Sequence, residues 1–298
     1  MPHPIALSAF GLCLVFGVGI ATVPVGTAPA RADMVTGQIQ PTVNAARIAR
    51  LTDTMLMDEI IAVMRDEGIE YGRTLSSEMF ADKGGAQWDA IVALIYDADT
   101  MRQRLDEALA QALSAAGGDL DAIEAFFGSP QGQEILRLEI EARRALLDND
   151  VEEAAKLSWE DLQTDGGPRM ERLKRFAEVN DLIESNVMGA MNANLAFYKG
   201  LSESGAFPEE MTEDQMLSDV WGQEPDVRAE TTDWLFPFLS MAYQPLSDDK
   251  LDGYIAFSET PAGQTMNAAL FAAFDAVFAK ISYDLGRAAA KQMQGEDI

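Results

Sequence analysis

Residues 126–133 read FFGSPQGQ and residues 257–264 read FSETPAGQ, and this repeated pattern decides the fold that the sequence predicts. In both stretches a Phe is followed, at the same spacing, by Ser or Thr, then Pro, Gly and Gln. The first set is Phe126, Ser129, Pro130, Gly132 and Gln133, and the second set is Phe257, Thr260, Pro261, Gly263 and Gln264. The offset from Phe126 to Phe257 is close to half of the chain that follows a short leader. The spacing therefore predicts two copies of one unit.

Each motif has the chemistry of a helix start. The Ser or Thr can accept hydrogen bonds from free backbone N–H groups, and the Pro fits the first helical position, where no N–H is needed. Gly is a poor helix former, so its presence predicts a close approach by another backbone, with the Phe packed beneath and the Gln bridging the two segments. The alternative is an anion site, which a first turn without Lys or Arg, and with Glu134 in the first copy, disfavours. We therefore predict a structural corner, with ligand contact as the weaker alternative.

Outside the motifs the apolar residues fall at helical spacing, and no sustained two-residue alternation interrupts them. The offset between the motifs also extends upstream, where it aligns Ile48 with Val179. We predict an all-α fold of two tandem, homologous helical-bundle units that pack against each other. The turn at Gly166-Gly167-Pro168 divides unit 1, at residues 33–165, from unit 2, at residues 169–298. Whether the units share one core, and whether they enclose a cavity, stays open at this point.

Residues 1–32 have the composition of a signal peptide. An apolar run from Ile5 to Ala21 precedes Ala30-Arg31-Ala32, the small-x-small pattern found before a cleavage point. The region before the run carries no Lys or Arg, which keeps an uncleaved membrane anchor as the alternative. We expect cleavage after Ala32 and a periplasmic or secreted mature protein. Contact with the membrane is then expected only through the signal peptide before cleavage.

Charge and residue types exclude several classes of function. The chain has 49 acidic and 22 basic residues and a formal charge of −27, so nucleic acid is not an expected partner. Its only His (His3) and only Cys (Cys13) lie in the leader, which leaves the mature chain without a His- or Cys-based nucleophile, zinc site or disulfide. We predict no catalytic, cofactor-binding or metal-binding residue. Most acids, Glu139 and Glu141 among them, are expected on solvated helix faces.

The two motifs resemble the signature of a family of exported bacterial proteins, domain of unknown function 2059 (DUF2059). The resemblance covers each motif and the helices predicted on either side of it. The chain departs from the usual pattern at Phe127 and Ser258, where a Tyr commonly stands, and in carrying the unit twice. The family has no established activity, so the resemblance implies an exported helical protein and no catalytic residue.

These observations favour an uncharacterised exported protein of the bacterial envelope with a binding role rather than an enzymatic one. Its expected partner is a protein or an amphiphile of the envelope, held between or beside the two units. The alternative is a carboxylate-dependent hydrolase acting on envelope glycans. That activity requires a cleft with two facing acids, one of them in an apolar setting that raises its pKa.

Overall fold

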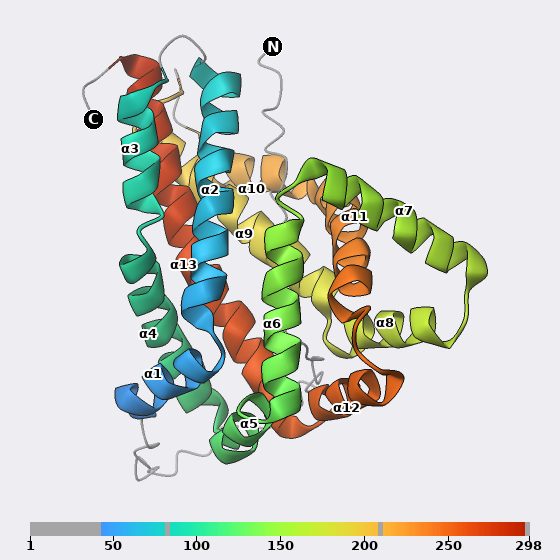
Figure 1. Ribbon diagram of the computed structural model, residues 1–298. Coiled ribbons are helices and arrows are strands. Elements are labelled where there is room, and N and C mark those ends of the chain that lie inside the picture. The colour runs from blue at the N-terminus through green and yellow to red at the C-terminus, as the bar shows by residue number, and fades with distance from the viewer. Residues whose placement is uncertain (1–42, 81–83, 208–210, 296–298) are drawn as a thin grey trace, which may run out of the picture.

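The computed structural model describes residues 43–80, 84–207 and 211–295, and within these ranges the regular structure is entirely α-helical (Figure 1). The predicted all-α fold is therefore confirmed. The predicted signal peptide lies outside the described residues. None of the described helices is long and apolar enough to cross a membrane.

The helices of the described ranges are α1 (Ala45–Thr54), α2 (Met57–Phe80), α3 (Ala86–Ile95), α4 (Ala98–Ala116), α5 (Leu120–Phe127), α6 (Pro130–Ala145), α7 (Asn149–Asp165), α8 (Pro168–Val179), α9 (Leu182–Glu203), α10 (Glu213–Trp221), α11 (Glu224–Tyr243), α12 (Asp248–Ser258) and α13 (Pro261–Gln294).

Capping residues in the sequence determine where several helices begin. Asp97, Asp119 and Ser247 each precede a helix, and each side-chain oxygen accepts a hydrogen bond from a backbone N–H of the first turn. α10 begins with a capping box, in which Thr212 and Gln215 satisfy each other's backbone N–H groups. Because each cap contributes about 1 kcal/mol, these residues fix the helix starts.

The order of the helices repeats along the chain. α1–α5 correspond in order and approximate length to α8–α12, and α6 together with α7 takes the place of the longer α13. The first two helices of each set are separated by a residue in the left-handed region, Leu56 with φ of 57° and Asp181 with φ of 46°. The offset between these two breaks is shorter than the offset between the motifs. The predicted alignment of Ile48 with Val179 uses the longer offset of the motifs, and it stays a prediction.

The apolar side chains form two clusters, and each cluster draws on both halves of the chain. The first joins residues of α1–α5, such as Leu105 and Leu109, to residues of α9 and α13, such as Phe274. The second joins Ile135 of α6 and Trp159 of α7 to α8, α11 and α12. α13 accordingly runs along α9 and α4 (Figure 1), while α6 and α7 pack against α11. The two halves therefore share their cores, and the boundaries proposed between units remain a prediction.

Candidate functional sites

The first motif forms the corner between α5 and α6. The Ser129 hydroxyl accepts from the N–H of Gly132 at 3.0 Å and donates to the carbonyl oxygen of Phe126 at 2.7 Å. Pro130 is the first residue of α6. The Gln133 side chain donates to a carbonyl oxygen of α5 at 2.9 Å and to a carbonyl oxygen at the end of α1 at 2.6 Å. The corner therefore ties three helices together.

The second motif makes the same corner between α12 and α13. The Thr260 hydroxyl accepts from the N–H of Gly263 at 3.0 Å and donates to the carbonyl oxygen of Phe257 at 2.7 Å. Pro261 is the first residue of α13, and Gln264 follows in the same helix. The distances equal those of the first corner, so the repeated residues adopt one local structure twice.

The two corners pack against each other, a contact that sequence analysis did not predict. The rings of Phe126 and Phe257 stack with centroids 3.8 Å apart and planes within 1° of parallel. Gln131 Nε2 donates to the carbonyl oxygen of Lys250 at 2.9 Å, and the Lys250 ammonium forms an ion pair with Glu134. The two corners therefore meet at one junction between the two halves, through the stacked rings of Phe126 and Phe257. This geometry supports a structural role.

An open groove of about 810 Å³ lies between one face of α4 and the helices α1 and α2. Two rows of α4 side chains line it at four-residue spacing, and the inner row is half-buried while the outer row is exposed. The inner row is Ala98, Arg102, Asp106 and Ala110, and the outer row is Asp99, Gln103, Glu107 and Gln111. The opposite wall is Ala45, Ile48 and Ala49 of α1 with Asp58 and Ile61 of α2. Alanine side chains leave the space open, and the carboxylates give its rim a negative charge.

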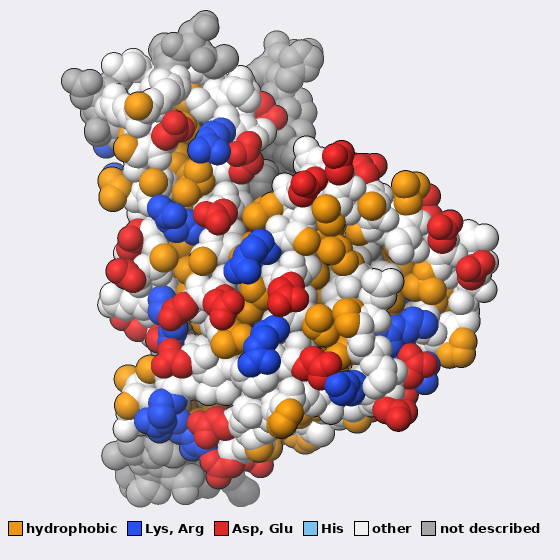
Figure 2. All heavy atoms as spheres, in the orientation of Figure 1, with side chains coloured by type: hydrophobic (Ala, Val, Ile, Leu, Met, Phe, Trp, Pro, Cys, Tyr) orange, Lys and Arg blue, Asp and Glu red, His pale blue; other side chains and the backbone are white. Residues whose placement is uncertain are grey.

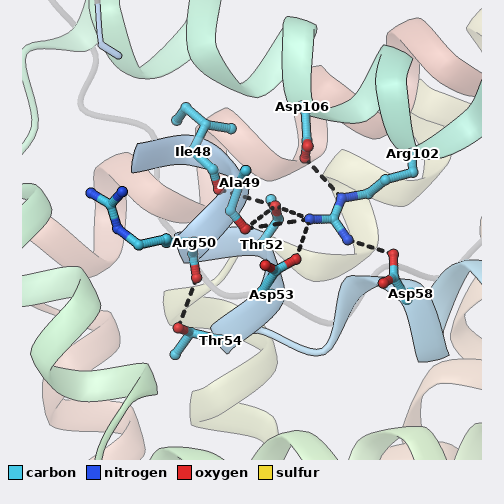
Figure 3. Close-up of polar contacts among 9 residues, drawn as sticks. All are labelled: Ile48, Ala49, Arg50, Thr52, Asp53, Thr54, Asp58, Arg102 and Asp106. Carbon is cyan, nitrogen blue, oxygen red and sulfur yellow. Dashed lines mark hydrogen bonds and ion pairs between the residues drawn. The ribbon is translucent and has the colours of Figure 1, made fainter. Parts of the chain in front are cut away.

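Among the described residues that line this groove, Arg102 is the one basic residue, and its guanidinium is bound within the protein (Figure 3). Its Nη2 donates to Thr52 Oγ1 at 2.7 Å and to Asp53 Oδ1 at 2.6 Å. Its Nε donates to Asp106 at 3.1 Å, and Nη1 forms an ion pair with Asp58. Burial alone would lower the pKa of Arg102, but the three carboxylates outweigh burial and raise this pKa. Arg102 therefore holds α1, α2 and α4 together and keeps its charge.

A smaller pocket of about 240 Å³ lies between α9 and α13, with Phe271 in its wall. Two of its lining residues are Asp181 and Asp275. Burial raises the pKa of Asp275, against the lowering effect of hydrogen bonds that Asn192 Nδ2 donates at 3.2 and 3.3 Å. Burial, and then the neighbouring charge of Glu184, raise the pKa of Asp181. Two carboxyl groups with raised pKa therefore share this pocket.

Glu139 is buried, contrary to the prediction that it lies on a solvated face. It is 7% exposed, because α6 is packed against both α2 and α11 at once. The Tyr243 hydroxyl donates to Glu139 Oε1 at 2.6 Å, and burial outweighs this bond and raises the pKa of Glu139 to about 8. Glu141 is exposed, as expected. Because Glu139 lines neither the groove nor the smaller pocket, it is an acid of the core rather than of a site.

One ion pair of low exposure joins α2 to α6. Arg143 donates from Nε and Nη2 to the two oxygens of Glu67, both at 2.8 Å, and the side chains are 8% and 15% exposed. The Arg143 guanidinium also lies 5.8 Å from the ring centroid of Trp234 on α11. Figure 2 shows acidic and basic side chains interleaved over α2 and α6, with hydrophobic side chains between α6 and α11. Charges on this face are therefore largely balanced, unlike those at the rim of the groove.

No group of three or more candidate metal ligands comes together in the part of the chain that the structure describes. Residues 99–157, from α4 into α7, match a family described as "Uncharacterized protein conserved in bacteria (DUF2059)". The matched segment contains the first motif, and it does not reach the second. Neither the comparison with curated proteins nor the comparison with solved structures found a match. The family match supports the resemblance for the segment around the first motif, and its description states no activity.

Proposed function

We propose that this chain is an exported, non-enzymatic binding protein of the bacterial envelope, periplasmic or secreted, which binds a partner protein or an amphiphile in the groove along α4. The groove carries the proposal, because a concave space of about 810 Å³ with alanine walls and a charged rim suits the side chains of a partner. The signal-peptide pattern of residues 1–32 supports export. The family match at residues 99–157 supports a bacterial origin.

The proposal includes two tandem copies of one unit, and matching ion pairs support it. In each copy an arginine of the fourth helix pairs with an acid in the first turn of the second helix. These pairs are Arg102 with Asp58 and Arg228 with Glu184, and the offset between the two arginines equals the offset between the two acids. Matching ion pairs between corresponding helices are what a duplication would produce.

A second set of ion pairs supports the same conclusion. In each copy an arginine of the first helix pairs with an acid of the fifth helix: Arg47 with Asp121, and Arg172 with Asp252. Arg172 follows Arg47 by the same number of residues as Asp181 follows Leu56 at the left-handed breaks. Asp252 follows Asp121 by the same number of residues as the second motif follows the first. The extra residues of the second copy therefore lie between these elements and leave the contact intact.

The groove can be tested by filling it. Ala45 is exposed and lines the groove, and Ala154 is exposed on α7 away from it, so Ala45→Trp and Ala154→Trp are matched variants. Tagged proteins are used to recover partners from envelope extract, and native mass spectrometry is used to detect a bound amphiphile. We expect wild type and Ala154→Trp to recover the same partner and Ala45→Trp to lose it. Equal recovery by both variants, or a bare monomer in every preparation, would contradict the proposal.

The smaller pocket favours a second candidate function, a carboxylate-dependent hydrolase of envelope glycans. Its supporting observation is that Asp181 and Asp275, both with raised pKa, line one pocket, since glycoside cleavage needs an acid that holds its proton. The test is release of soluble fragments from purified peptidoglycan by wild type and by Asp275→Asn. Release by wild type that Asp275→Asn abolishes would favour the hydrolase, and no release by either would remove it.

A further inference from the structure

We propose that the occupant of the groove along α4 is a basic amphipathic helix of a partner protein. The inference rests on the proposed binding function and names the chemistry of the partner. Four carboxylates and one guanidinium line the groove, and the guanidinium of Arg102 is already paired with Asp53, Asp58 and Asp106. On the outer row, Asp99 and Glu107 are exposed, and neither forms an ion pair with a residue in the described ranges. Lysine or arginine side chains of the occupant would complement these two acids.

The shape of the groove fits a helix. Its α4 wall runs from Ala98 to Gln111, which corresponds to about 20 Å of helix, or about 14 residues of an occupant. The two rows on α4 are ridges at four-residue spacing. The ridges of another helix pack between rows of this kind. Ala98 and Ala110 of α4 and Ala45 and Ala49 of α1 all line the groove, and their small side chains leave room in it for large apolar side chains of the occupant.

In the second copy, another part of the chain covers the row of α11 that corresponds to the inner row of α4. The offset that relates Arg102 to Arg228 also relates Ala110 to Phe236, which therefore stands at the corresponding position of α11. The Phe236 ring stacks on Trp159 of α7, with centroids 4.9 Å apart. In the second copy an aromatic ring and a neighbouring helix of the chain thus fill the place that stays open beside Ala110. A helix from a partner would supply that filling in the first copy.

The experiment uses two fluorescein-labelled peptides of about 14 residues. One places Leu on one helical face and Lys on the other, and the second has Glu in place of Lys. Fluorescence anisotropy measures their binding to the mature protein. We expect the Leu/Lys peptide to bind and the Leu/Glu peptide not to bind. Ala45→Trp should weaken the Leu/Lys peptide by at least about 10-fold, since a tryptophan at the groove wall blocks the apolar face.

Charge variants separate the carboxylates of the groove from the general negative charge of the protein. The double variant Asp99→Asn with Glu107→Gln should weaken the Leu/Lys peptide by about 3- to 10-fold, and should reduce the loss of affinity between about 50 and 300 mM salt. The control is Glu160→Gln with Asp161→Asn, which removes two exposed acids of α7. The control should bind as wild type does, because its acids lie outside the groove.

The outcomes distinguish this inference from the proposed function. If both peptides bind wild type equally and Ala45→Trp abolishes the binding of both, the groove binds helices without regard to charge. The inference of a basic occupant then fails, and the proposed binding function stands. If dodecyltrimethylammonium binds with the same variant dependence while the peptide does not, the occupant is an amphiphile and the inference fails. If the peptide binds only after residues 33–42 are removed, the occupant of the groove is the chain's own N-terminal segment and the inference fails. If Ala45→Trp changes neither peptide binding nor partner recovery, both proposals fail.

Discussion

Replacing Gly132 with Ala tests whether the corner requires close backbone contact. A Cβ at this position would lie 2.2 Å from the carbonyl oxygen of Phe126 and 2.8 Å from Cα of Phe127. Both are backbone atoms, so they cannot rotate away as the end of a side chain could, and α5 has to move. Overpacking of this kind costs about 1–3 kcal/mol or more, and the better helix propensity of Ala returns roughly 1 kcal/mol. Because two backbone atoms clash at once, we expect a net loss of about 2 kcal/mol in the free energy of unfolding.

The assay is urea unfolding of the mature protein, followed by circular dichroism, with Gly189→Ala as the control. Gly189 is a glycine inside α9 where an added Cβ meets nothing within 4 Å, so this variant should gain roughly 0.5–1 kcal/mol. Gly263→Ala should lose about as much as Gly132→Ala, because its Cβ would lie 2.2 Å from the carbonyl oxygen of Phe257. A Gly132→Ala protein as stable as wild type, alongside a stabilised Gly189→Ala protein, would refute the reasoning.

The buried charges, the shared cores and the leader give further tests. The pKa of Glu139 is raised from 4.5 to about 8, so its contribution to stability is fully present below pH 4.5 and is lost as the pH rises through 8. Relative to wild type, Glu139→Gln should gain on the order of 3 kcal/mol between pH 5 and pH 8, measured by urea unfolding at both values. Arg143→Met should cost about 3 kcal/mol in the same assay because it leaves the carboxylate of Glu67 unpaired, and Glu67→Gln should recover part of this loss. When the chain is cut after Gly166, each half alone should unfold without cooperativity, because the halves share their cores. The mixed halves should unfold cooperatively, and circular dichroism measures both transitions. Amino-terminal sequencing of the exported protein should begin at Asp33, and a sequence that begins at Met1 would indicate an uncleaved anchor.

Local sequence rules predict the helices and the corners, because both depend on residues close together in the chain. Ser129 and Pro130 define a helix start whatever lies around them, and Gly132 indicates the close backbone contact that the structure contains. The upstream register could not be predicted in the same way. Apolar residues of a helix recur every three or four positions, so several offsets align two apolar stripes equally well. Contacts between distant residues, such as the pairs of Arg102 with Asp58 and of Arg228 with Glu184, favour one offset over the others for the proposed duplication.

The burial of Glu139 and the position of the groove depend on which helices meet. Glu139 falls at the spacing of the buried residues Ile135 and Leu136 on α6, but its charge led to the prediction of a solvated face, and α2 and α11 cover it from opposite halves of the chain. The groove did leave a signal in the sequence. Along α4 the apolar row of Met101, Leu105 and Leu109 accounts for the core, while alanines recur at Ala98 and Ala110 on a face that otherwise carries charged and amide side chains. Small residues on a polar helix face mark a place where something larger can approach.

The difference between the two proposed copies explains why binding is proposed on one side only. The chain bends after Ala145 to form α7, whereas α13 continues straight for 34 residues and lies against α9 so closely that a Cβ on Gly286 would be 2.2 Å from the carbonyl oxygen of Phe197. Because α7 bends, it reaches α11 and stacks Trp159 on Phe236. The straight α13 packs against the apolar row of α4 and leaves the alanine and carboxylate rows open. In the proposed duplication the long helix is broken after α6 in one copy and continuous as α13 in the other, which gives one covered face and one free face, and the free face is the groove.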